Sequence, residues 1–126
     1  MKSLKQEYKI ESSLESVWDA LVNPRTIVKW GGGPAKMDNK KGFKFSLWGG
    51  DIHGENIRVV QNKILEQKWM AGKWDNYSQV KFELSFKNGV TKIVLTHKDI
   101  PDEEFIEIKE GWQLYYVGEV KKLLES

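Results

Sequence analysis

The sequence predicts an α+β fold: a curved antiparallel sheet of about six strands, two short helices, and a long C-terminal helix that covers one face of the sheet. Three observations favour this fold class. Residues 4–11 alternate between apolar and polar, as strands do, and residues 43–97 repeat that alternation between turn-forming residues. From Glu103 to Leu124, apolar residues instead recur at helical spacing. A length of 126 residues suits one hydrophobic core, so we expect a single domain over residues 1–126.

The first strand is expected from Leu4 to Glu11, where one face would carry Leu4, Gln6, Tyr8 and Ile10. Ser12-Ser13-Leu14-Glu15 follows as a capping-box pattern. In this interpretation the Ser12 hydroxyl accepts a bond from a backbone N–H at the start of a helix, and Glu15 returns the bond. The helix ends at Asn23-Pro24, because the residue before a proline disfavours the α region.

A second short helix is expected from Pro24 through Trp30, since proline is favoured at the first helical position. Gly31-Gly32-Gly33-Pro34 then breaks that helix. This glycine run follows a helix instead of a strand and lacks the lysine of a phosphate-binding loop. We therefore interpret it as a flexible loop.

The central part of the chain is predicted to consist of strands at residues 43–48, 51–60, 64–69, 80–86 and 91–97. In the second of these, the inward alternation is interrupted near Gly54, which predicts a β-bulge there. Asn88-Gly89 predicts a tight hairpin turn, because both positions tolerate positive φ. Ile100-Pro101-Asp102 ends the sheet.

The long C-terminal helix is expected from Glu103 to Leu124. Its broad apolar stripe consists of Phe105, Ile108, Trp112, Tyr115, Tyr116, Val120, Leu123 and Leu124. Gly111 lowers helix stability within that stripe and predicts a kink or a close backbone approach. A curved sheet around a single helix can enclose a cavity, which is where we expect a ligand to bind.

The composition excludes several classes of function. There is no cysteine, so disulfides, thiolate nucleophiles and cysteine-held metal clusters are excluded. The 20 basic and 18 acidic residues are dispersed without a basic stripe, so we expect no nucleic-acid partner. The N-terminus has no secretory signal, and no stretch approaches the ~20 apolar residues of a membrane span. We therefore expect a cytoplasmic location and no membrane partner.

Large aromatic residues are more numerous than a core of this size needs, with six tryptophans in the chain. Some of them should line a cavity or form an exposed contact surface; the alternative, that all of them pack in the core, stays open. The candidate cavity residues are Trp18, Trp30, Phe45, Trp69, Trp74, Phe82, His97, Trp112, Tyr115 and Tyr116.

The two histidines are the first residues to consider for catalysis or metal binding. His53 would share a strand face with Asp51 and Glu55, which suits a metal site or an acid–base set, but a solvent-exposed polar face is the favoured interpretation. His97 lies on the inner face with Ile93 and Leu95. It could contact a ligand or act as a base, but a core histidine with satisfied hydrogen bonds is favoured.

No catalytic motif is present: there is no nucleophile elbow, no HExxH and no phosphate-binding loop. The polar residues expected inside the cavity are His97 with Thr91 or Tyr116, which are few for an active site. We therefore expect no enzyme activity, no catalytic residues, no metal and no cofactor.

The chain resembles the C-terminal domain of the activator of heat-shock protein 90 ATPase, within the START-like, or SRPBCC, superfamily. The resemblance covers nearly the whole chain in collinear order. Its motifs are Val17-Trp18-Asp19-Ala20-Leu21, Asn23-Pro24 through Trp30, Gly42 to Gly50 with Ile52-His53-Gly54-Glu55, Lys68-Trp69 with Trp74, Asn88-Gly89, Ile100-Pro101, and Glu110 to Tyr116.

The resemblance implies a helix-grip fold and binding to the N-terminal region of the chaperone, which favours the closed, ATPase-competent state. In the full-length co-chaperone a separate N-terminal domain precedes this one, and the present sequence does not contain it. The family often has arginine and proline after its two paired tryptophans; here those positions hold Met70 and Asp75. These departures bear on the partner more than on the fold.

Two functions follow as expectations. The first is a non-enzymatic binding domain that resembles the chaperone-binding domain, with a heat-shock protein 90 chaperone as its partner and a role in co-chaperone activity or the stress response. The alternative is the binding or sensing of a small apolar ligand in the cavity between the sheet and the C-terminal helix.

Overall fold

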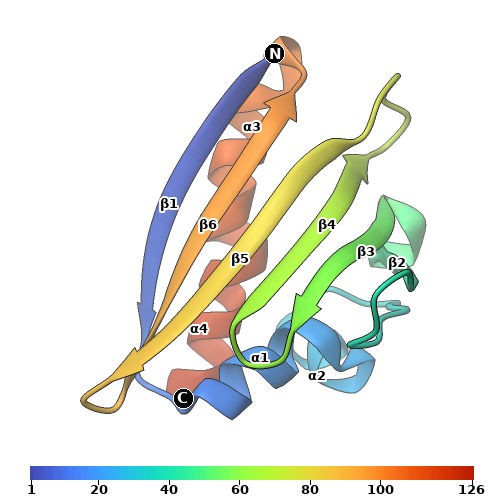
Figure 1. Cartoon of the computed structure of the whole chain (residues 1–126). Helices are drawn as coiled ribbons and strands as arrows, with labels where there is room; N and C mark the ends of the chain where they lie inside the picture. The colour runs from blue at the N-terminus through green and yellow to red at the C-terminus, as the bar shows by residue number, and fades with distance from the viewer.

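The computed structural model describes residues 1–126, which form one antiparallel sheet with helices on one face (Figure 1). The sheet has six strands in the order β1-β6-β5-β4-β3-β2. The strands are β1 (Lys2–Ile10), β2 (Lys44–Leu47), β3 (Ile52–Val60), β4 (Ile64–Ala71), β5 (Ser78–Lys87) and β6 (Val90–Ile100). The predicted fold class is therefore confirmed: a curved sheet wraps the C-terminal helix in a helix-grip arrangement.

Cross-strand register places large apolar side chains on the inner face of the sheet. Phe82 of β5 pairs with Leu65 of β4 on one side and with Leu95 of β6 on the other. All three residues are buried, because the inner face packs against the helices. The predicted hairpin between β5 and β6 is confirmed, and Asn88 and Gly89 both have positive φ.

Helices α1 (Leu14–Val22) and α2 (Pro24–Trp30) confirm the two short helices and the boundary at Asn23. The Asn23 side chain accepts a bond from Arg25 N at 3.0 Å and so caps α2. The predicted capping box was wrong by one residue: Ser13, not Ser12, is the N-cap, and its Oγ accepts from Ser16 N at 3.1 Å. Ser12 is held outside the helix because its N–H bonds to Ile10 O.

The bulge predicted at Gly54 was also wrong in position. The register shift between β3 and β4 lies between Asn56 and Arg58. Gly54 instead allows a close backbone approach, since a Cβ there would lie 1.8 Å from Lys68 O. The bulge follows Asn56, whose buried side chain donates to Asp38 O at 2.9 Å and thereby fixes the preceding loop.

The C-terminal helical region is not one uniform α-helix. A 3₁₀ turn (Asp102–Glu104) leads into α3 (Phe105–Gly111), a π-helical segment (Trp112–Tyr116) and α4 (Val117–Glu125). Gly111 is not the site of the irregularity, because its φ and ψ of −61° and −34° are helical. The distortion lies at Tyr116, with φ −113° and ψ −95°. Wider turns of this kind are frequent at functional sites.

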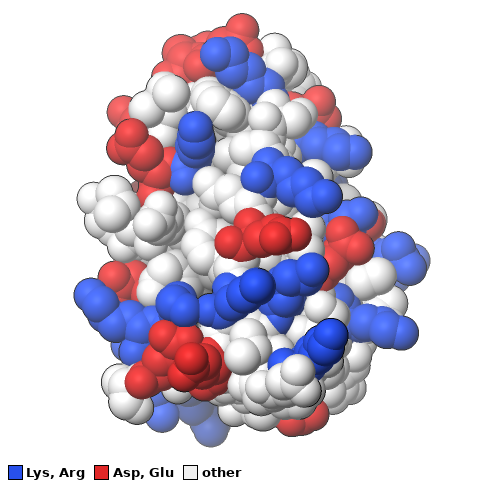
Figure 2. All heavy atoms as spheres, turned by 90° about the vertical axis from the view of Figure 1, so that its left-hand side faces the viewer, with Lys and Arg blue, Asp and Glu red and all other residues white.

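The outer surface carries charges of both signs. Figure 2 looks onto the β1 side of the molecule, where Lys and Arg side chains are intermixed with Asp and Glu side chains and separated by uncharged areas. Lys92 of β6, for example, lies 3.9 Å from Glu7 of β1. None of the helices is long and apolar enough to cross a membrane.

Candidate functional site

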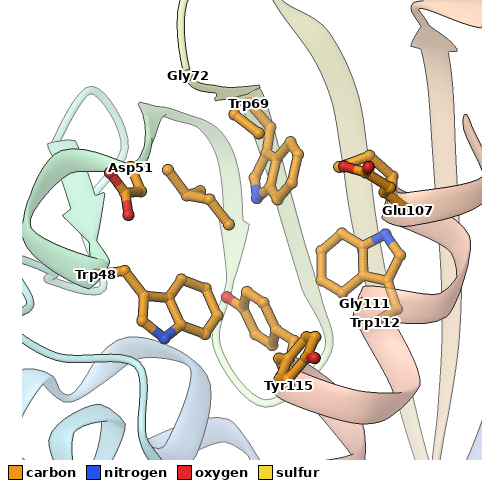
Figure 3. Close-up of a pocket in the computed structure, with 12 residues that line it drawn as sticks. Trp48, Asp51, Trp69, Gly72, Glu107, Gly111, Trp112 and Tyr115 are labelled. Atoms are coloured by element: carbon orange, nitrogen blue, oxygen red, sulfur yellow. The ribbon is translucent and has the colours of Figure 1, made fainter. Parts of the chain in front are cut away.

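A cavity of about 500 Å³ lies between the sheet and the C-terminal helical region. Three parts of the chain form its walls: the turn that joins β2 to β3, the end of β4, and one face of α3 with the π-helical segment. Figure 3 shows aromatic rings on the wall from each of these parts. The lining residues are Trp48, Asp51, Ile52, Trp69, Ala71, Gly72, Glu107, Ile108, Gly111, Trp112, Tyr115 and Tyr116.

The turn before β3 depends on residues in the left-handed backbone region. Trp48 has φ 49°, which is uncommon for a bulky residue, and Gly49 and Gly50 continue with φ 68° and 107°. Three backbone bonds anchor this turn to other segments: Trp48 N donates to Gly32 O at 2.8 Å, Gly49 N donates to Pro34 O at 2.9 Å, and Gly72 N donates to Asp51 O at 2.7 Å. The last of these bonds ties the turn to the end of β4, so these two walls of the cavity are connected.

The helical wall follows from residue spacing. Glu107, Gly111 and Tyr115 lie four residues apart and therefore share one helix face. Trp112 lies beside Gly111, and its ring centroid is 4.7 Å from that of Tyr116 and 5.3 Å from that of Trp69. Trp48 closes the cluster with its ring 5.8 Å from Tyr116. The cavity wall is thus a continuous surface of aromatic rings.

His97 lies behind this wall and does not line the cavity. Its Nδ1 accepts a bond from Trp112 Nε1 at 3.1 Å, and its Nε2 lies 2.8 Å from Ser78 Oγ. Ser78 in turn donates to Trp69 O. Burial lowers the pKa of His97 to about 3, so the ring is neutral at physiological pH. These contacts match the favoured interpretation of a satisfied core histidine.

Polar groups enter the cavity at two levels. The exposed carboxylates of Asp51 and Glu107 lie on opposite sides of the opening (Figure 3). Deeper inside, Trp69 Nε1 and Tyr116 Oη are buried without a hydrogen-bond partner. Burial raises the pKa of Tyr116, so its hydroxyl keeps its proton and can donate. The Trp69 and Tyr116 atoms have almost no accessible surface, so a ligand in the cavity would reach these two unused donors only if the rings around them shift. The two carboxylates at the edge are exposed.

Four of the ten predicted cavity residues line the cavity: Trp69, Trp112, Tyr115 and Tyr116. The other six lie outside the lining of this cavity. They lie elsewhere because the inner face of the sheet is filled by side chains along most of its length. Buried in the core or behind the aromatic wall are Trp18, Trp30, Phe45, Phe82 and His97. Trp74 is half-buried beside Trp69, with ring centroids 6.0 Å apart.

Sequence reasoning left eight lining residues out of the candidate set: Trp48, Asp51, Ile52, Ala71, Gly72, Glu107, Ile108 and Gly111. Helical spacing counted backward from Tyr115 would have found Gly111 and Glu107. No local signal points to Ala71 or Gly72, because their position at the cavity depends on how the end of β4 meets the turn before β3.

The second histidine belongs to a different surface. His53 lies near Tyr77, with 3.4 Å between Nδ1 and the hydroxyl, and near Gly72 O at 3.3 Å. Asp51 precedes β3 and lines the cavity, so it does not share a regular strand face with His53 and Glu55 as predicted. No group of three His, Asp or Glu side chains is arranged to hold a metal ion.

Comparison with known proteins assigns the chain to a family. The family described as Activator of Hsp90 ATPase homolog 1-like protein matches residues 11–125. The Activator of 90 kDa heat shock protein ATPase homolog 2 of Mus musculus is 27% identical over 117 residues, which are 91% of this chain and 35% of that protein. Homolog 1 of Homo sapiens is 26% identical over 113 residues, which are 88% of this chain and 33% of that protein. The chain thus spans about a third of the length of these relatives.

Among solved structures, an HSP90 activator from Plasmodium falciparum superposes with a TM-score of 0.91 at 27% identity. The match covers 99% of this chain and 97% of that one. A similar domain therefore makes up nearly all of that solved chain, in contrast to the longer relatives.

Proposed function

Because the chain belongs to the family of Activator of Hsp90 ATPase homolog 1-like proteins, we propose that it is a non-enzymatic binding domain that contacts an Hsp90 chaperone in the cytoplasm. The observation that carries this proposal is the end-to-end match with the Plasmodium falciparum HSP90 activator. That solved chain is described as an HSP90 activator and consists almost entirely of a domain with this size and fold.

The chemistry of the cavity supports binding over catalysis. Asp51, Glu107 and Tyr116 make no side-chain hydrogen bond to one another, so no acid–base pair is assembled. His97 has both ring nitrogens engaged behind the wall. An assay of the isolated domain for hydrolase or cyclase activity should therefore give no turnover above the uncatalysed rate.

Hsp90 binding is tested by calorimetric titration of the domain into purified Hsp90 from the same organism, with and without a non-hydrolysable ATP analogue. We expect saturable binding and an increase in Hsp90 ATPase rate. Background hydrolysis is subtracted with an inhibitor of the Hsp90 nucleotide site. Absence of binding in both nucleotide states would overturn the proposal.

A second function, the binding of a small ligand with an apolar body, is favoured by the cavity itself. Its volume of about 500 Å³ lies within the range of ligand pockets, roughly 300–1,000 Å³. Five of the twelve lining residues are aromatic, and two unpaired donors lie just beneath the wall.

A further inference from the structure

We propose that the cavity takes an amphipathic organic cation: an amine or quaternary ammonium group at the opening, and an apolar body with a hydrogen-bond acceptor inside. This inference rests on the second function proposed above, ligand binding in the cavity, and specifies the chemical class of that ligand. Three observations from different parts of the cavity carry it.

The first observation is the charge at the opening. Asp51 and Glu107 are the charged residues of the lining, which contains no Lys, Arg or His. Neither carboxylate takes part in any of the ion pairs of this structure, which join other residues. Since they lie on opposite sides of the opening (Figure 3), a cation between them meets negative charge from both sides. The same arrangement repels a fatty acid or another anionic amphiphile.

The second observation is the nature of the wall. The faces of tryptophan and tyrosine rings attract cations through their quadrupoles, and tryptophan does so most strongly. Trp48, Trp69 and Trp112 supply three indole rings to this one cavity. Tyr115 adds a ring that is 65% exposed. An alkylammonium group can therefore lose water on entry and still be stabilised.

The third observation is the pair of unused donors inside. Trp69 and Tyr116 are each only 2% exposed, yet Trp69 Nε1 and Tyr116 Oη have no partner. In Figure 3 the indole nitrogen of Trp69 points toward the space enclosed by the labelled aromatic rings. Both atoms are covered by neighbouring side chains, so a ligand reaches them only after a small shift of the surrounding rings. A buried donor is costly to leave unpaired, so a ligand that brings an ether, carbonyl or hydroxyl oxygen to this depth gains a bond that a plain hydrocarbon does not.

The test compares three probes of nearly equal shape: (3-phenoxypropyl)trimethylammonium, its neutral analogue with carbon in place of nitrogen, and 3-phenoxypropylsulfonate. Binding is followed by NMR through the indole N–H signals, with Trp69 as the reporter and Trp18 in the core as the internal reference. We expect the cation to bind at least ten-fold more tightly than the neutral probe, and the anion to bind least.

Variants assign the charge preference to the opening. The double substitution Asp51→Asn with Glu107→Gln should lower cation affinity about ten-fold and leave the neutral probe unchanged. Glu103→Gln, close in sequence but outside the lining, is the matched control and should change neither. Gly111→Leu, which places a large side chain in the wall, should abolish binding of all three probes, and its far-UV circular dichroism verifies that it is folded.

The outcomes distinguish a preference for cations from ligand binding itself. Equal affinity for the cation and the neutral probe, or preference for the anion, would overturn the cation inference and leave ligand binding intact. If none of the three probes shifts the Trp69 indole N–H signal of the wild type, so that it behaves like the folded Gly111→Leu variant, both the cation inference and the ligand-binding function are wrong.

Discussion

The His97 ring sits in a chain of hydrogen bonds whose protons can be assigned from chemistry alone. Trp112 Nε1 can only donate, so His97 Nδ1 must be unprotonated. The proton is then on Nε2, which donates to Ser78 Oγ, and the Ser78 hydroxyl donates to Trp69 O. A second proton on His97 would set two N–H groups against each other. The neutral ring is therefore part of what holds β6, β5 and the helical region together.

The first prediction concerns pH. The pKa of His97 is about 3 in the folded protein and 6.5 ordinarily, so the unfolded chain binds the proton more readily. The resulting stability is complete above about pH 6.5 and is lost as pH falls toward 3, with a slope approaching about 1.4 kcal/mol per pH unit. Urea unfolding between pH 7.5 and 5 should show this slope in the wild type and lose it in His97→Gln.

His53→Gln is the matched control for this measurement, because His53 lies at the surface near Tyr77. It should keep the pH dependence of the wild type. An unchanged slope in His97→Gln would mean that His97 is not the group responsible.

The second prediction compares two tryptophans on the same wall. Trp112→Phe leaves His97 Nδ1 buried without its donor, whereas Trp69→Phe removes an indole N–H that has no partner. Both variants lose the same ring volume. We therefore expect Trp112→Phe to cost about 1–3 kcal/mol more in free energy of unfolding, measured by urea denaturation followed by circular dichroism. Equal losses would show that the His97 bond contributes little.

For a single residue, the sequence predicts which face of the sheet the side chain occupies better than it predicts the hydrogen-bond partner of that side chain. Alternation with Ile93 and Leu95 placed His97 on the inner face correctly. Its partners Ser78 and Trp112 lie 19 and 15 residues away, and only the packing of the helix against the sheet brings them together.

Among the elements, the π-helical segment has the clearest local cause. An extra residue enters the turn between Trp112 and Val117, and Gly118 sits against the widened turn. A Cβ at Gly118 would lie 1.7 Å from Gln113 O, closer than any side chain tolerates. Gly111, by contrast, has helical dihedrals, and its Cβ would meet only Tyr115 Cδ2 at 4.0 Å.

The third prediction follows from this contrast between glycines. Gly111→Ala should raise the free energy of unfolding by about 1 kcal/mol, because alanine has the higher helix propensity. Gly118→Ala should lower it by about 1–3 kcal/mol, because the turn must deform. Thermal unfolding of the two variants compares them directly; a loss of stability in Gly111→Ala would mean that this position needs glycine for another reason.

The fourth prediction concerns the cap of α1. Ser13→Ala removes the oxygen that accepts from Ser16 N and should cost about 1 kcal/mol in chemical denaturation. Ser12→Ala is the control, since Ser12 contributes its backbone N–H and not its hydroxyl. A larger loss of stability in Ser12→Ala than in Ser13→Ala would support Ser12 as the cap, as the sequence pattern predicts.

Elements were predictable where one periodicity runs without interruption. The strands, the short helices and the boundary at Asn23-Pro24 follow from alternation and from the backbone limits of proline. The π-helical segment was not predicted, because the stripe from Phe105 to Leu124 suits an ordinary α-helix. The residue associated with the π-helical segment is Gly118. Position 118 requires glycine only because the distorted turn brings Gln113 O close to it, so the sequence alone does not reveal the requirement.

For the whole molecule, one buried cluster includes residues of both layers. Trp69 and Phe82 of the sheet pack with Trp112 and Tyr116 of the helical region. The fifth prediction is therefore that sheet and helix unfold together: far-UV circular dichroism and tryptophan fluorescence should give coincident urea transitions. Two separate transitions would show that the helical region can detach from the sheet.

The cavity depends on how separate elements of the whole molecule pack together, so the sequence identified only part of its lining. Aromatic residues on the C-terminal helix were identifiable from the stripe. Three of them, Trp112, Tyr115 and Tyr116, line the cavity, as does Trp69 of β4. Whether Trp30 or Trp48 faces the cavity depends on where α2 and the turn before β3 meet the sheet. Local patterns carry no information about that meeting point.

The strand order puts β1 and β2 at the edges of the sheet, and a backbone bridge between Ser46 and Lys36 partly covers the outer side of β2. Such edges invite pairing between molecules, which leads to aggregation. Here β2 has only four residues, too few to serve as a long template, and β1 presents Lys5, Glu7 and Lys9 to solvent. A second strand that approached β1 would have to accommodate these charges. The same alternation that builds the fold thus also discourages edge-to-edge association at high concentration.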